Sequence, residues 1–208
     1  FQEKGVPAVI AGLPAPGIRL PYVSVDHEAT MFHAVGRLTS KGHRRIAMIA
    51  RSSSSPGLKS FLAAFEQTCP RMGKDKVDGQ IILMKKDCPA YVGRQLLNCL
   101  NFKDPITAFI IGSPLHTITA FSHLPEHGIR IPRDVSIVTT YGDHNLHHLI
   151  PNPSRYFFDA HVFGNKIFDF ITKLASGLDL TNRRYLVVPE PVQGASIGNI
   201  RTLAQPVR

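Results

Sequence analysis

Short apolar runs alternate with helix-like patterns through the middle of this 208-residue chain. The runs are typical of buried strands, and they cover residues 46–50, 81–84, 108–111 and 135–139. Between them, apolar residues recur at the three- and four-residue spacing of amphipathic helices. Strands that alternate with helices form parallel sheets with helices on both faces. The pattern therefore predicts a complete, doubly wound α/β lobe in the middle of the chain.

The flanking segments hold fewer elements of the same kinds. We expect strands at residues 7–12, 22–25, 156–158 and 185–188, and helices from Asp26 to about Lys41 and over residues 162–175. Gly42 and Gly177 follow these two helices, where a left-handed residue commonly ends a helix. The flanks are too short for a second sheet of equal size. We therefore interpret them as part of a second α/β lobe that is incomplete in this chain.

The composition is that of a globular protein, with 43% hydrophobic and 19% charged residues. No apolar run approaches the roughly 18–20 residues of a membrane span. The net charge of +9 suits a nucleic-acid surface, but Lys and Arg are scattered, which favours an ordinary solvated surface. The three cysteines form no CxxC pair and are typical of a reducing cytoplasm. Because the chain begins with Phe1 and shows no signal-peptide pattern, we interpret it as a fragment.

Three polar clusters have a chemical reading and a simpler structural one. His144 and His148 would share a helix face as metal ligands, but no third ligand accompanies them, so we expect a surface loop and no metal. Residues 52–55 are polar and precede a helix, as phosphate-binding loops do, but a flexible loop explains them without a GxGxxG motif. Helix capping explains the Asp-His-Glu cluster at residues 26–28. The sequence contains no catalytic constellation, so we expect neither an enzyme nor a cofactor.

Four segments, in this order along the chain, resemble the LacI/GalR family of bacterial transcription regulators. They are LTSKGHRRIAMI at residues 38–49, PITAFII at 105–111, GIRIPRDVSIV at 128–138 and LVVPEPVQGAS at 186–196. The first is similar to the helix-to-strand junction of the family, and the third to its helix end, turn and strand. The resemblance covers nearly the whole chain and implies a periplasmic-binding-protein-like fold. In that fold two lobes with doubly wound parallel sheets are joined by three crossing segments, and a small effector binds between them.

The resemblance also implies a division of the chain. We expect residues 1–42 and 155–188 in an N-terminal lobe that is incomplete here, and residues 43–154 in a complete C-terminal lobe. Residues 189–208 would cross back to the C-terminal lobe and form the tail. The three crossings would then fall near residues 42–44, 154–158 and 188–190.

The effector site is expected where the carboxyl ends of the strands meet the cleft between the lobes. This rule and the cleft positions of the family select Arg51, Ser53, Phe61, Ser113, Tyr141, Asp143 and Phe158. The ligand-holding arginine of the family falls on Phe61, and its Asn-Asp pair falls on Ser113 and Pro114. The polar groups that grip a sugar are therefore largely absent. We expect either a planar or anionic effector or a cleft that no longer binds a ligand.

The function that the resemblance implies is that of a cytoplasmic repressor-type regulator. This chain would be its effector-binding and dimerisation core, in which a small molecule controls operator affinity. The helix-turn-helix headpiece of the family lies upstream of the core, and nothing similar occurs in this sequence. Operator DNA would therefore be bound through a segment absent from this chain, in a homodimer that makes no membrane contact. The alternative is a solute-binding protein of a transporter, which shares the fold.

Overall fold

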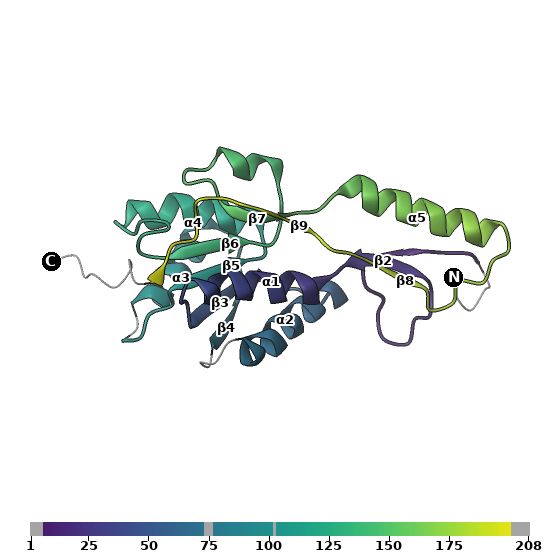
Figure 1. Ribbon diagram of the computed structural model, residues 1–208, viewed down its shortest axis with the longest axis horizontal. Helices are drawn as coiled ribbons and strands as arrows, with labels where there is room; N and C mark the ends of the chain where they lie inside the picture. The colour runs from purple at the N-terminus through teal and green to yellow at the C-terminus, as the bar shows by residue number, and fades with distance from the viewer. Residues whose placement is uncertain (1–5, 73–76, 102, 201–208) are drawn as a thin grey trace.

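The computed structural model describes residues 6–72, 77–101 and 103–200. Figure 1 shows two lobes placed along the long axis of the molecule. One lobe is built on a six-stranded sheet and the other on a three-stranded sheet. Residues 1–5 and 201–208, at the ends of two of the expected segments, lie outside the described residues. None of the described helices is long and apolar enough to cross a membrane.

The larger sheet has the strand order β4-β3-β5-β6-β7-β9. In that order its strands are β4 (Asp78–Met84), β3 (Arg45–Arg51), β5 (Ala108–Ile111), β6 (Ser136–Thr139), β7 (Ser154–Phe157) and β9 (Glu190–Val192). The first five are parallel to one another, which confirms the predicted doubly wound α/β sheet. Only β9 runs antiparallel, beside β7 at the edge.

Helices cover both faces of this sheet (Figure 1). They are α1 (His27–Ser40), α2 (Pro56–Thr68), α3 (Pro89–Leu100) and α4 (Pro114–Glu126), with short 3-10 helices η2 (Cys69–Arg71) and η3 (His144–His148). Helices α1 and α2 share one buried cluster with the sheet, and α3 and α4 share a second cluster with it. The segment expected as a loop with three histidines thus contains a single short helix, η3.

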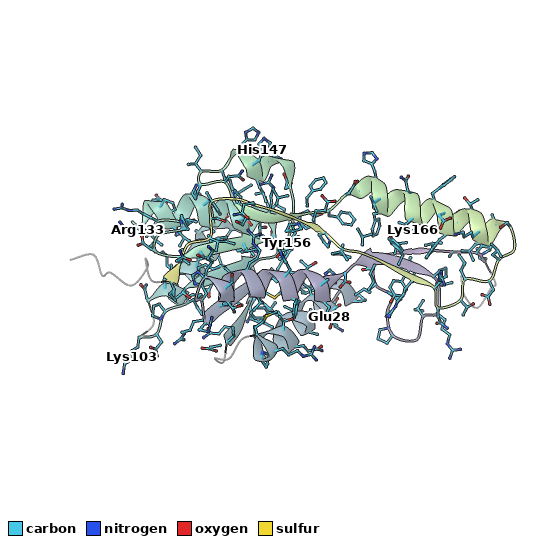
Figure 2. The ribbon with its side chains drawn as sticks, in the orientation of Figure 1. Glu28, Lys103, Arg133, His147, Tyr156 and Lys166 are labelled. Carbon is cyan, nitrogen blue, oxygen red and sulfur yellow. The ribbon has the colours of Figure 1, made fainter. Side chains whose placement is uncertain are left out.

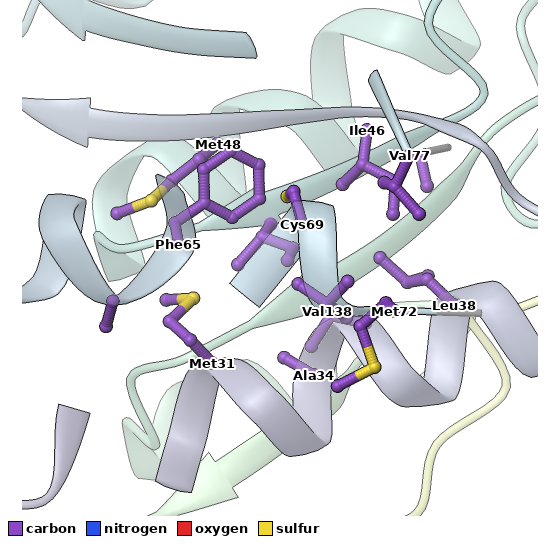
Figure 3. Close-up of a cluster of buried hydrophobic side chains, with 14 of the residues drawn as sticks. Met31, Ala34, Leu38, Ile46, Met48, Phe65, Cys69, Met72, Val77 and Val138 are labelled. Atoms are coloured by element: carbon purple, nitrogen blue, oxygen red, sulfur yellow. The ribbon is translucent and has the colours of Figure 1, made fainter. Parts of the chain in front are cut away.

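The cluster under α1 and α2 shows why the sequence folds in this way (Figure 3). Met31 and Leu38 lie two helical turns apart on α1, and both are fully buried. They pack in the same cluster as Ile46 and Met48 of β3 and Phe65 of α2. Since side chains at i and i+7 share a helix face, the apolar spacing of α1 presents one continuous face to the sheet.

The packing of α1 corrects one expected boundary. We expected residues 1–42 in the N-terminal lobe, which is the smaller one, with a crossing near residues 42–44. Instead, α1 packs on the six-stranded sheet of the larger lobe. The chain leaves the smaller lobe after Val25, where β2 ends. The periodicity of α1 correctly identified a buried face. It contained no information on which sheet covers that face, because an amphipathic helix pairs equally well with either.

The smaller lobe consists of a three-stranded parallel sheet and one helix. Its strands, in the order β1-β2-β8, are β1 (Ile10–Ala11), β2 (Tyr22–Val25) and β8 (Arg184–Val187), and its helix is α5 (Ala160–Ala175). Val23, Phe170 and Val187 form its buried centre. The strand expected over residues 7–12 is therefore only two residues long, since β1 pairs with β2 alone and at two positions.

Candidate functional site

The predicted strand-end site lies at one edge of the six-stranded sheet. Because β3, β5 and β6 are parallel, their carboxyl ends meet at that edge. Helices α1, α2 and α4 begin there as well, and Figure 1 shows α1 running away from the smaller lobe along the sheet. This edge, made by the carboxyl ends of the strands, therefore faces the smaller lobe. It combines strand ends with helix N-termini, which is a common ligand-binding arrangement in α/β folds.

An aromatic pair joins the first turn of α1 to α2. The rings of His27 and Phe61 meet edge to face with 5.6 Å between their centres. Phe61 also lies against Gly112, where an added Cβ would sit 3.1 Å from the ring. Burial lowers the pKa of His27, although the neighbouring Asp26 carboxylate opposes this shift. His27 is therefore neutral near pH 7, so it offers one N–H donor and one acceptor.

From the sequence, Asp26 and His27 were expected only to cap α1. Asp26 does cap α1, since its Oδ1 accepts from the Ala29 amide at 2.9 Å. The contact of His27 with Phe61 was missed, because the two residues lie on different helices and no spacing along the chain connects them.

A network of three polar side chains, Arg51, Asp87 and His116, lies at the same edge. The Arg51 guanidinium donates from Nε to Asp87 at 2.9 Å, and the other Asp87 oxygen lies 3.1 Å from Nε2 of His116. The His116 side chain is only 1% exposed, and its Nδ1 is buried without a hydrogen-bond partner among the described residues. Arg51 itself is 72% exposed. This network thus extends from a buried imidazole on α4 to a solvent-facing guanidinium at the end of β3.

Two serines of the predicted set lie close to these groups in the sequence and differ in their bonding. Ser53 is exposed, and its hydroxyl accepts from the Ser55 amide at 3.1 Å, within the turn before α2. Ser113 occupies the N-cap position of α4, and its side chain makes no capping hydrogen bond. The Ser113 hydroxyl is therefore available to another partner at the helix N-terminus.

The remaining predicted residues lie in three different environments. Tyr141 follows β6 and is 59% exposed. Asp143 caps η3, since its carboxylate accepts from the Asn145 amide at 2.7 Å. Phe158 packs against Phe163 with 5.2 Å between ring centres, within the core of the smaller lobe. The structure therefore does not bring Phe158 into contact with Phe61 as part of one aromatic wall.

Residues 35–197 match the model of the periplasmic binding protein-like domain family. The chain belongs to this family. A curated relative is the HTH-type transcriptional repressor CytR of Escherichia coli strain K12, which is 30% identical over 137 residues. The match covers 66% of this chain and 40% of CytR, so the matched part spans less than half the length of that relative.

Solved structures show the same fold. A LacI family transcriptional regulator from Bifidobacterium animalis subsp. lactis superposes with a TM-score of 0.83 at 19% identity, covering 95% of this chain and 71% of the other. A dimeric Lac repressor with a C-terminal deletion superposes with a TM-score of 0.79 at 19% identity, covering 94% and 70%. The family match and the CytR relative confirm the expected resemblance to LacI/GalR effector-binding cores, and the solved structures confirm the fold.

Three segments of the described chain cross between the two lobes and form a neck. The segments between β2 and α1, between β7 and α5, and between β8 and β9 make these crossings. The Asp26 amide donates to the Val187 carbonyl at 2.8 Å, which joins the first crossing to the third. Phe157 pairs with Glu190 across β7 and β9, which joins the second to the third. The three crossings therefore form one connected strip.

A buried tyrosine fixes this strip to the larger lobe (Figure 2). Tyr156 of β7 is 1% exposed, and its hydroxyl lies 2.7 Å from Nδ1 of His33 on α1. Burial raises the pKa of Tyr156 to about 12, so its hydroxyl stays protonated and shares one hydrogen bond with the imidazole. Arg37 of α1 also donates to the Ser154 hydroxyl at 3.3 Å. These bonds couple the element after the first crossing to the strand before the second.

Proposed function

We propose that this chain is the effector-binding core of a LacI-type transcription regulator, with a small molecule held between the lobes. The family match supports this proposal, because residues 35–197 match the periplasmic binding protein-like domain family. The relatives named as transcriptional repressors and regulators favour regulation over solute transport and over catalysis. The regulator acts in the cytoplasm as a homodimer, and it binds operator DNA through a separate headpiece.

The effector that suits the strand-end edge is a planar molecule with an anionic group. The His27–Phe61 pair offers an aromatic surface for stacking. Arg51 offers an exposed guanidinium, which Asp87 orients from behind. The Ser113 hydroxyl and the α4 N-terminus add donors beside it. Tyr141 and Asp143 form the rim of this site, whereas Phe158 supports the smaller lobe from within, against Phe163.

The mechanism of regulation is a shift between open and closed arrangements of the lobes. A ligand changes this balance only through its different affinities for the two arrangements. The connected strip at the neck makes the lobes move as two bodies about one hinge, because a change at one crossing is transmitted to the others. Such a movement repositions the paired headpieces and changes their affinity for DNA.

A thermal-shift screen tests the effector class, since a ligand that binds only the folded state raises the melting temperature. We expect planar anionic metabolites to stabilise the protein and neutral hexoses to have no effect. Arg51→Gln should weaken binding of a hit by at least about tenfold, as loss of a charge-assisted bond predicts. Arg133→Gln is the matched control, because Arg133 pairs with Asp134 in the turn after α4, away from the strand-end edge.

Tight binding of a neutral sugar that is lost in Ser113→Ala and unchanged in Arg51→Gln would contradict the effector assignment. The coding sequence upstream of this chain separates the two functional alternatives. A helix-turn-helix segment there supports the regulator, and a signal peptide would instead establish the transport protein.

A further inference from the structure

The last turn of α4 gathers three side chains with metal-ligating atoms. His123, Glu126 and His127 stand at positions i, i+3 and i+4, so they share one face of the helix. One ligand atom from each lies within 4.8 Å of the other two. Among the described side chains, this is the one place where three such residues come together.

His123 is held in place by the neighbouring helix. Gly93 of α3 leaves room for its ring, since an added Cβ would overlap the ring atoms Cδ2, Cγ and Nε2. Nδ1 of His123 instead lies 3.7 Å from the Glu126 carboxylate. The ring is therefore fixed by packing on one side and offers Nδ1 to the cluster on the other.

His127 is held in a tautomer that suits a ligand. Its Nδ1 lies 2.9 Å from the backbone carbonyl of His123. Because a carbonyl oxygen only accepts, Nδ1 carries the proton, and Nε2 keeps its lone pair. A hydrogen bond from the second ring nitrogen to a backbone carbonyl is the usual support of a metal-bound histidine.

We propose that His123, Glu126 and His127 bind one divalent cation of borderline softness, with Zn²⁺ as the best fit. Two imidazoles and one carboxylate form a common zinc ligand set and leave the fourth tetrahedral position to water. Ligand atoms around tetrahedral zinc stand roughly 3.3 Å apart, given bond lengths of about 2.0–2.1 Å. The His123–Glu126 separation of 3.7 Å is already close to that value. Glu126 and His127 are exposed, so their side chains are free to turn the remaining distance.

Electrostatics favours a cation at this place. The cluster occupies the C-terminal turn of α4, where the helix dipole is negative and unpaired carbonyl groups collect. The opposite end of α4 lies at the proposed effector edge. The metal site is therefore separate from the effector site, and its test does not depend on the proposed function.

Titration calorimetry with ZnCl₂ on the full chain tests the proposal. We expect saturable binding of one Zn²⁺ per chain, and an affinity lowered at least about tenfold in Glu126→Gln and in His127→Gln. Both residues are exposed, so neither substitution should disturb folding. Cobalt(II) serves as a spectroscopic probe that replaces zinc, because tetrahedral Co(II) absorbs visible light more strongly than octahedral Co(II). The two variants should lose this absorption.

The matched control is the double variant His147→Gln/His148→Gln. These residues are a second pair of neighbouring histidines, with rings 3.8 Å apart on η3 (Figure 2 labels His147). The control should bind Zn²⁺ as the parent protein does. The proposal is overturned if the parent protein shows no saturable binding. It is also overturned if affinity falls in the control and not in the α4 variants.

Discussion

Replacing Leu38 by Ala measures how firmly α1 is attached to the six-stranded sheet. Leu38 is fully buried between α1 and β3. Removal of a buried leucine side chain costs about 2–5 kcal/mol, from lost burial and from the cavity that forms. Ala forms helices at least as well as Leu, so the loss reports packing rather than helix propensity. For a protein of this size, a loss of about 3 kcal/mol lowers the melting temperature by about 6–12 °C.

Urea titration and thermal unfolding of the same samples measure this effect. Phe32→Ala is the matched control on the same helix, because Phe32 is 59% exposed and should change stability by less than about 0.5 kcal/mol. Equal losses in the two variants, or a loss below about 1 kcal/mol in Leu38→Ala, would refute the packing of α1 on the larger lobe.

Two further predictions concern buried titratable groups. Burial lowers the pKa of His43 from 6.5, and its Nε2 lies 3.1 Å from the Gly198 carbonyl. The unfolded chain takes up this proton at higher pH than the folded protein, so the free energy of unfolding should fall as pH drops below about 6.5. Urea titrations from about pH 8 to 5 should show this decline, and an equally steep decline in His43→Gln would contradict our assignment. Burial raises the pKa of both Cys69 and Cys99 to about 11, whereas Cys88 is exposed. A thiol reagent at about pH 8 should label one cysteine in the native protein and three after unfolding, and rapid native labelling of two or more would exclude this burial.

Local signals in the sequence predicted local structure well. Asp26 begins α1, and Gly42, with φ of +92°, follows its end as predicted. Strand β9 was missed as a strand, because it has three residues and contains Pro191. Its place in the sheet depends on pairing with β7, a long-range contact that leaves no periodic pattern in the sequence.

The candidate site was predictable only in part for a related reason. The strand-end rule selected Arg51, which does end β3, and a family cleft position selected Phe61 of α2. The rule did not select Asp87, which pairs with Arg51 from a loop, or His116, which contacts Asp87 from the first turn of α4. Phe158 was expected to face the cleft, but a family position fixes the backbone and not the direction in which a new side chain packs.

The three side chains proposed as zinc ligands follow a helical spacing that is visible in the sequence. The letters HLPEH place His123, Glu126 and His127 on one face of a helix whose presence had been predicted. A metal was weighed only for the histidines of residues 144–148, because they are closest together in the sequence. The supporting contacts, from Gly93 and from the His123 carbonyl, become visible only in three dimensions.

The pairing of β2 with β8 sets the order in which the protein can be completed on the ribosome. Tyr22 pairs with Arg184, so β2 emerges long before its partner strand has been made. At about 5–20 residues per second, the wait is about 8–30 s. Residues 26–157, by contrast, supply most of the larger lobe as one continuous stretch. The larger lobe can therefore begin to fold first during translation, while the edge of β2 that pairs with β8 stays without its partner strand until β8 has been made.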